Sequence, residues 1–138
     1  MINRPSEVAA AMFAKDTASQ ALGMEIVDVS EGRATVRMTV RPDMVNGLEV
    51  CHGGIIFSLA DSAMAFSSNS FNRRAIATHA DIDWVSPGRL GATLTATAVQ
   101  RHQRGRNAIT DVVVEDEAGE VIAQFRGRTR QIDGQHLP

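Results

Sequence analysis

The sequence has one cysteine, Cys51, and no tyrosine, and only 4% of its 138 residues are aromatic. A single cysteine excludes an internal disulfide framework and a zinc site built from several thiolates. The four scattered histidines form no HExxH pattern. We therefore expect no metal and no cofactor.

Long apolar runs and an excess of one charge are missing as well. No run approaches the roughly 20 residues that cross a bilayer, and no apolar leader core precedes Lys15. The formal net charge is −2, which argues against a dedicated nucleic-acid-binding protein. These absences predict a cytoplasmic protein with no membrane and no nucleic-acid partner.

What is present is typical of one globular domain. Hydrophobic residues make up 43% of the chain and charged residues 22%, close to the average of soluble proteins. A chain of 138 residues is too short for two well-filled cores. We expect residues 1–138 to form a single domain.

The hydrophobic pattern predicts two helical pieces, a β-hairpin, a long helix and then four strands. The expected helices cover residues 5–15, 17–22 and 53–70, and the expected strands cover 24–29, 33–40, 76–86, 93–103, 107–116 and 120–132. Residues 41–52 are expected to be irregular, because Pro42 and the Asn46-Gly47 pair interrupt regular structure. The polar tail after Asp133 is expected to fray.

This order of elements predicts an α+β fold. Runs of strands that follow a helix favour an antiparallel sheet over alternating βαβ units. Strands of about 10 residues are ~33 Å long, and a helix of about 18 residues is ~27 Å long. The sheet can therefore wrap one nearly buried helix.

The long helix carries a single formally charged side chain, Asp61, in the stretch from 50 to 72. A carboxylate in an apolar helix is costly unless it is paired or useful. Asp61 belongs to a helical stripe of small and polar residues, which are Ser58, Asp61, Ser62, Ala65, Ser68 and Asn69. The stripe is either a solvent face or a face turned toward a cavity or a second subunit. Its lack of Lys and Glu favours the second interpretation.

The Gly53-Gly54 pair begins this helix. The first N–H groups of a helix have no partner inside the helix and carry the positive end of its dipole. They can stabilise an oxyanion, although a tight turn into the helix would also explain two glycines. Asp61 lies eight residues beyond Gly53, ~12 Å along the axis. If both groups act on one carbonyl, which must lie ~3 Å from each, two subunits must supply them. The catalytic interpretation therefore predicts a homo-oligomer with sites at a two-fold interface.

Residues 44–70 read MVNGLEVCHGGIIFSLADSAMAFSSNS and contain the pattern N-G-x-x-x-C-H-G-G-x-x-F-S-L-A-D. Together with residues 16–23, 81–88, 93–102 and 123–128, they make the chain resemble the PaaI-type phenylacetyl-CoA thioesterases of the hotdog fold. The resemblance implies a long central helix wrapped by a curved antiparallel β-sheet. It also implies hydrolysis of phenylacetyl-CoA or ring-hydroxylated phenylacetyl-CoA in phenylacetate degradation, by dimers that pair into homotetramers.

The resemblance also implies roles for individual residues. Asp61 matches the acidic catalytic residue, which is either a nucleophile or a general base on water. Gly53 matches the backbone donor that polarises the thioester carbonyl. Asn46 and His52 match loop residues that line the pocket across the interface. Trp84 stands where the family commonly has Phe.

Further residues are candidates for binding the substrate. Gly54 would let a ligand approach the backbone closely, and Thr78 and Asp81 are expected near Asp61. The phosphates of CoA could be held by arginine donors, for which the candidates are Arg89, Arg101 and Arg104. For the arginines on the outer sheet face, a merely solvated surface is the competing interpretation.

Two other residues are expected to have structural rather than catalytic roles. Cys51 and His52 are adjacent, but neighbouring residues rarely point at each other and no third group orients them. We expect Cys51 to be a packed thiol. His79 lies between apolar residues of a predicted strand, and we expect it to be a structural histidine.

Three other functions compete with aryl-acyl-CoA hydrolysis. The first is hydrolysis of medium-chain acyl-CoA. The second is a non-catalytic acyl-CoA sensor, because hotdog domains can bind a thioester without cleaving it. The third is a hydratase or dehydratase, which would pair a histidine with the acid on the long helix. Here that helix has Asp61 but no histidine.

Overall fold

The protein is described by a computed structural model over residues 4–138. Its helices are α1 (Arg4–Phe13), α2 (Thr17–Ala21) and α3 (Gly53–Ser68), with a short 3-10 helix η1 (Pro42–Met44). Its strands are β1 (Glu25–Ser30), β2 (Arg33–Thr39), β3 (Ala75–Trp84), β4 (Thr93–Arg104), β5 (Asn107–Glu115) and β6 (Val121–Gln131). Every helix and strand predicted from the sequence is confirmed, with bounds that differ by two residues at most.

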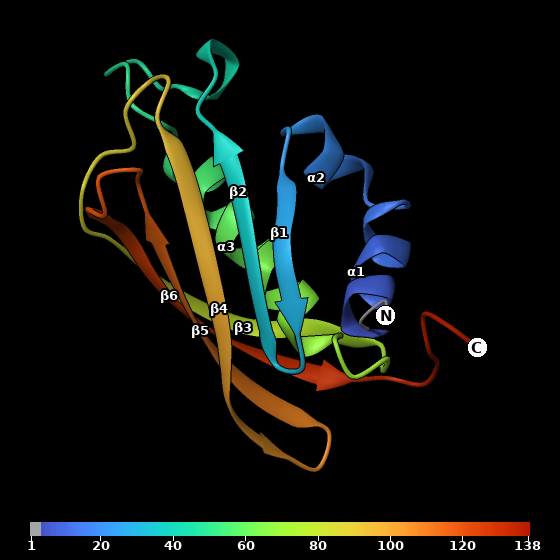
Figure 1. Cartoon of the computed structure of the whole chain (residues 1–138). Coiled ribbons are helices and arrows are strands. Elements are labelled where there is room, and N and C mark those ends of the chain that lie inside the picture. The colour runs from blue at the N-terminus through green and yellow to red at the C-terminus, as the bar shows by residue number, and fades with distance from the viewer. Residues whose placement is uncertain (1–3) are drawn as a thin grey trace.

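The six strands form one antiparallel sheet in the order β1-β2-β4-β5-β6-β3. The sheet curves around α3, which lies against its inner face (Figure 1). The chain therefore forms the α+β architecture that the sequence predicts, a long helix wrapped by a curved antiparallel sheet. The strand order does not follow the chain, because β3 pairs with β6 at one edge.

The core lies between α3 and the inner face of the sheet. The alternating residues of β2 that the sequence assigns to one face, such as Val36 and Met38, are buried. They meet Leu59, Ala63 and other buried residues of α3. Gly127 of β6 lets Met64 pack on the strand, because a Cβ there would overlap the Met64 sulfur. Alternation in the strands and an apolar helix thus build one core.

Two expectations from the sequence are wrong in detail. The segment expected to be irregular contains η1, where Pro42 occupies the first helical turn and suits it. The tail after Asp133 is held rather than frayed. Asn72 Oδ1 accepts the backbone N–H groups of His136 and Leu137 at 3.1 and 2.9 Å, and His136 Nε2 lies 2.8 Å from Asn69 Oδ1.

The two edges of the sheet differ in how they are covered. Strand β1 packs against α1, as Figure 1 shows. Strand β3 is the other edge, and it and the residue after it expose Ile76, Trp84 and Val85. Open edges and exposed apolar side chains are typical of surfaces that take a partner. Among residues 4–138, no helix is long and apolar enough to span a membrane.

Candidate active site

Asp61 lies on the third turn of α3 and lines a hollow of about 330 Å³. The other walls come from residues 16–22, which include α2, and from Met24. Of the polar stripe of α3, Ser58, Ser62 and Ala65 line this hollow with Asp61, whereas Ser68 and Asn69 do not. The apolar lining includes Leu22, Met24 and Phe57. Within residues 4–138, the Asp61 carboxylate accepts no hydrogen bond and pairs with no cation. It is therefore free to act on a ligand.

Burial raises the pKa of the Asp61 carboxyl above its usual 3.8, and the nearby carboxylate of Asp16 raises this pKa further. A base whose pKa is closer to the working pH accepts a proton more readily. Sequence reasoning missed Asp16 as part of this wall. The available signal was local: Asp16 precedes α2 and its side chain accepts the N–H of Ser19, as expected of a helix N-cap.

The first turn of α3 presents one free backbone donor. His52 caps the helix, and its Nδ1 accepts the N–H of Gly54 at 3.0 Å. No acceptor within the described residues binds the N–H of Gly53. Of the two glycine amides, that of Gly53 is therefore the one available to a developing oxyanion.

Trp84 of β3 fixes the position of Gly53. Its Nε1 donates to the Gly53 carbonyl at 3.1 Å, and a Cβ on Gly53 would meet the indole ring at 3.1 Å. A side chain at position 53 would therefore meet the indole closely, and Trp84 would have to shift by a few tenths of an ångström to accept it. Trp84 and Gly53 line a second hollow of about 290 Å³ with Ser86 and Pro87.

The structure does not bring Gly53 and Asp61 together in one chain. The hollow at Gly53 and the hollow at Asp61 share no lining residue. Eight residues of helix separate the two groups by ~12 Å, as the sequence predicts. A reaction that uses both groups needs a second copy of the chain.

Asn46 and His52 flank a loop that folds back on itself. Asn46 Oδ1 accepts the N–H of Leu48 at 2.9 Å, and the backbone N–H of His52 donates to Met44 at 2.8 Å. His52 and Gly54 line another shallow hollow. Both loop residues thus lie near the start of α3 and away from Asp61 of the same chain.

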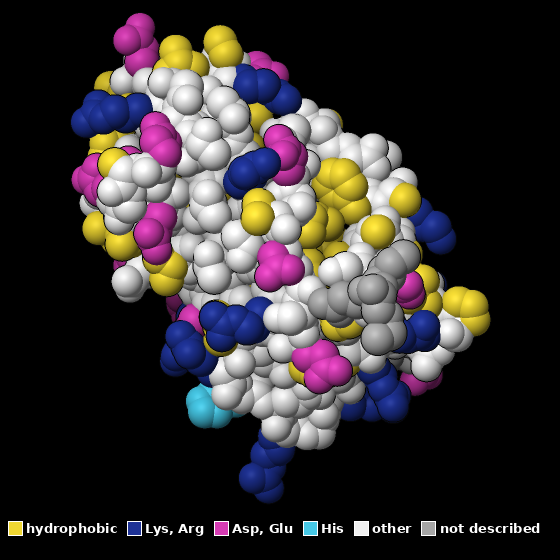
Figure 2. Space-filling view, viewed as in Figure 1, with side chains coloured by type: hydrophobic (Ala, Val, Ile, Leu, Met, Phe, Trp, Pro, Cys, Tyr) yellow, Lys and Arg dark blue, Asp and Glu magenta, His cyan; other side chains and the backbone are white. Residues whose placement is uncertain are grey.

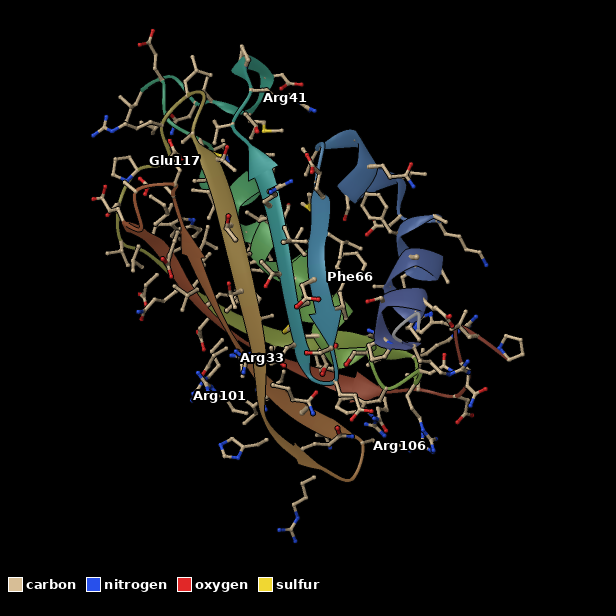
Figure 3. The ribbon with its side chains drawn as sticks, in the orientation of Figure 1. Arg33, Arg41, Phe66, Arg101, Arg106 and Glu117 are labelled. Carbon is tan, nitrogen blue, oxygen red and sulfur yellow. The ribbon has the colours of Figure 1, made fainter. Side chains whose placement is uncertain are left out.

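Of the remaining candidates, Asp81 and Arg101 line one hollow of about 360 Å³ over the sheet, separate from the hollow of Asp61. Arg101 is bound to Asp111 at 3.2 Å on the outer face of the sheet, and it lies on the lower half of β4, away from α3 (Figure 3). Arg104 is exposed at the end of β4. Arg89 is closer to the first turn of α3, because it forms a bridge with Val50. Acidic and basic side chains are scattered together over the face seen in Figure 2.

Neither Thr78 nor Asp81 lines the hollow of Asp61 in the same chain. Thr78 donates to the Arg128 carbonyl at 3.4 Å, and Asp81 lies 3.1 Å from His79. Both are exposed. His79 is exposed as well, so it is a surface histidine partnered by Asp81 rather than part of the core.

Cys51 is buried, as expected. Burial raises the pKa of its thiol to about 11. The His52 ring accepts from Gly54 and not from this thiol. The pair therefore forms no nucleophile–base arrangement.

Comparisons with known proteins show the family of the chain. Residues 48–123 match the thioesterase superfamily. The chain is 41% identical to the acyl-coenzyme A thioesterase PaaI of Escherichia coli over 97% of this chain and 96% of that protein.

Two solved structures extend the comparison to the fold. The E. coli PaaI protein from the phenylacetic acid degradation operon superposes with a TM-score of 0.94 at 41% identity, over 96% of each chain. The Thermus thermophilus protein TT0310 gives a TM-score of 0.82 at 34% identity, over 86% of this chain and 99% of that one. The chain belongs to the thioesterase superfamily and has its hotdog fold.

Proposed function

We propose that the protein is an acyl-CoA thioesterase that hydrolyses phenylacetyl-CoA or ring-hydroxylated phenylacetyl-CoA to the free acid and CoA. The similarity to E. coli PaaI supports the reaction. The observation that carries the proposal is the unpaired, half-buried Asp61 beside a hollow with Leu22, Met24 and Phe57 in its wall. A lining of this kind suits an aryl group.

The chemistry requires little machinery. A thioester carbonyl is electrophilic and a thiolate is a good leaving group. Asp61 either removes a proton from the water that attacks the carbonyl carbon, or attacks that carbon itself. In both cases the C–S bond breaks, and the CoA thiolate leaves and takes up a proton. In the second case the acyl group stays on Asp61 as a mixed anhydride, which water hydrolyses to the free acid. The Gly53 N–H stabilises the negative charge that develops on the carbonyl oxygen. His52 keeps the neighbouring Gly54 amide occupied, so that one donor is presented.

The reacting groups must then come from two subunits. The open edge of β3 supports a dimer in which β3 of one subunit lies along β3 of the other. This arrangement would extend the sheet, cover Ile76 and Trp84, and let Gly53 of one subunit approach Asp61 of its partner. We propose that such dimers pair into tetramers, as the family resemblance implies.

Arg89 is the arginine best placed to bind a CoA phosphate. It is exposed and forms a bridge with Val50, just before the first turn of α3. Arg101 is already paired with Asp111. We therefore assign Arg101 to the surface and keep Arg89, with Arg104 as a second candidate, for the nucleotide end of the substrate.

The test is release of CoA, measured with a thiol reagent. Phenylacetyl-CoA, hydroxyphenylacetyl-CoA and straight-chain acyl-CoAs are compared with wild type and Asp61→Asn, with folding checked by circular dichroism. We expect turnover of the aryl thioesters, and a loss of about 10²-fold or more in Asp61→Asn. Since Cys51 is buried, it adds little background.

Three other outcomes of this assay would contradict the proposal in different ways. Binding without turnover would favour the acyl-CoA sensor. Faster turnover of straight-chain thioesters would favour a medium-chain thioesterase. Equal activity of wild type and Asp61→Asn would show that Asp61 does not carry the reaction.

A further inference from the structure

A chain of hydrogen bonds runs along the polar wall of the Asp61 hollow. Asp16 Oδ2 accepts the Ser19 hydroxyl at 2.6 Å, and the hydroxyl oxygens of Ser19 and Ser62 lie 2.9 Å apart. Ser62 follows Asp61 in α3, and all these residues line the same hollow. The chain therefore links the start of α2 to the turn of α3 that carries Asp61.

The direction of the hydrogens in this chain is fixed by its first member. A carboxylate has no hydrogen to give, so the Ser19 hydroxyl must donate to Asp16. Ser19 then has no hydrogen left, and in its contact with Ser62 it can only accept. Ser62 consequently spends its single hydrogen on Ser19, and its oxygen retains only acceptor capacity.

The rest of the polar wall is also made of acceptors. The Ser58 hydroxyl donates to the carbonyl of Gly54 at 2.9 Å, one turn back in α3. Asp61 and Asp16 are carboxylates. Among the described residues that line the hollow, no side chain therefore has a hydrogen left to donate. Any hydrogen bond between a ligand and the side chains of this wall must therefore be donated by the ligand.

Ser62 is the best-defined of these acceptors. Its hydroxyl is held by Ser19, which is almost fully buried. Hydrogen bonds in a row polarise one another, and this row ends on a charged group. α2, which carries Ser19, is held at its far end as well, because Arg41 Nη2 donates to the Ala21 carbonyl at 2.9 Å. Figure 3 shows Arg41 beyond the end of β2 on the side of α2.

We propose that Ser62, held by Ser19 and Asp16, is a specificity-determining residue that accepts a hydrogen bond from a hydroxyl group on the acyl part of the thioester. This inference rests on the proposed function, since it assumes that the acyl group enters the Asp61 hollow. Leu22, Met24 and Phe57 would contact the ring, and the Ser62 oxygen would take the hydroxyl hydrogen.

The experiment compares kcat/KM for phenylacetyl-CoA with its 3-hydroxy, 4-hydroxy and 4-methoxy derivatives. In wild type, one hydroxy derivative should be favoured about 3- to 10-fold over phenylacetyl-CoA, the effect of one net hydrogen bond. The methoxy derivative has no hydrogen to donate and should not share this advantage. Ser62→Ala should lower kcat/KM for the favoured hydroxy derivative more than for phenylacetyl-CoA and so lose the preference, whereas Ser62→Thr should retain it.

Ser58→Ala is the matched control, because it removes a hydroxyl from the same helix and the same hollow. It should keep the preference. The proposal is overturned if wild type does not distinguish the thioesters, or if Ser62→Ala still does. It is also overturned if Ser58→Ala loses the preference equally, or if Ser62→Ala slows all thioesters alike, since that would place Ser62 on the attacking water.

A binding measurement separates this inference from the proposed function. Calorimetric titration of Asp61→Asn and of Asp61→Asn/Ser62→Ala with the same thioesters does not depend on turnover. A hydroxyl preference in the first variant that is absent from the second supports the role of Ser62 even if Asp61 proves not to be catalytic. Equal binding of all thioesters by both variants contradicts it, whatever the activity.

Discussion

Two carboxylates face the same hollow, Asp61 on α3 and Asp16 at the start of α2. Asp16 has a structural task, since it caps α2 and binds the Ser19 hydroxyl. Asp61 has no such partner within residues 4–138. A half-buried carboxylate without a partner costs stability. At the residue scale, this difference in partners separates Asp61, which is available for chemistry, from Asp16, which supports the surrounding structure.

The first prediction concerns how pH acts on Asp61. Burial and Asp16 raise its pKa above 3.8, and the proposed reaction needs the ionised form. The acid limb of kcat/KM should therefore lie at a higher pH than for an ordinary aspartate. Asp16→Asn removes the like charge while Asn still caps α2, so the pKa of Asp61 should fall and the limb should move to lower pH.

A pH–rate profile of both proteins measures this shift. Among the described residues, Asp16 is the other charged residue that lines the hollow of Asp61. Asp16 also lines a neighbouring hollow, together with Lys15, Arg74 and His136. An unchanged limb in a folded Asp16→Asn variant would show that Asp16 does not act on Asp61 through its charge.

At the scale of elements, the sequence predicted most of the fold. Strand alternation in β2 and the apolar length of α3 were sufficient to assign each element and its buried face. The strand order, with β3 at the edge beside β6, was not predictable, because it depends on long-range pairing that local patterns do not encode. The ordered C-terminal segment after Asp133 was missed for the same reason, since it is bound by Asn69 and Asn72, which lie more than 60 positions away in the sequence.

The site was predicted in part. The motif around Asp61 and Gly53 predicted that both residues lie on one long helix and are too far apart to act together in one chain, as the structure has them. Their catalytic roles stay predictions. The wall formed by Asp16 and Ser19 was missed, because α2 reaches α3 only through tertiary packing. Trp84 was noted only as standing where the family commonly has Phe, because its contact with Gly53 depends on how β3 lies against the start of α3.

The packing of α3 on β6 gives a second prediction. A Cβ on Gly127 would overlap the sulfur of Met64 and lie 3.0 Å from the Phe125 ring. Since both neighbours are buried, Gly127→Ala should destabilise the protein by about 1–3 kcal/mol through overpacking. Urea unfolding measures the change.

Gly47→Ala is the control for that experiment, because a Cβ there meets nothing within 4 Å. It should change stability by about 0.5 kcal/mol or less. In a Met64→Ala background, Gly127→Ala should cost less than it does alone, since the clash is removed. An equal cost in both backgrounds would rule out the contact with Met64 as the cause.

At the scale of the whole molecule, we propose that one chain holds two half-sites. Gly53 offers a free amide at one end of α3, and Asp61 faces a different hollow near the middle of the helix. The edge strand β3 exposes apolar side chains beside the first of these. The proposed dimer would bring the two halves together, which makes assembly a condition for activity.

The amide can be removed without removing the helix. Gly53 is the first residue of α3, a position that tolerates proline. The residue before it, His52, has φ −57° and ψ 134°, an extended conformation that is compatible with a following proline. Gly53→Pro deletes the N–H and should lower kcat about 10²- to 10³-fold. Gly53→Ala adds a similar contact with Trp84 but keeps the N–H, so it is the matched control and should remain more active.

Mixing two inactive variants tests the central claim most directly. The variants Asp61→Asn and Gly53→Pro are unfolded together in equal amounts, refolded and assayed for CoA release. The control is an equal mixture of Asp61→Asn with the double variant Asp61→Asn/Gly53→Pro. If each site takes Asp61 and Gly53 from different subunits, half of the dimers have one intact site, and activity should return to about one quarter of wild type. The control pair should stay inactive. Mixed dimers with no activity above that of the parent variants would contradict a site shared between subunits.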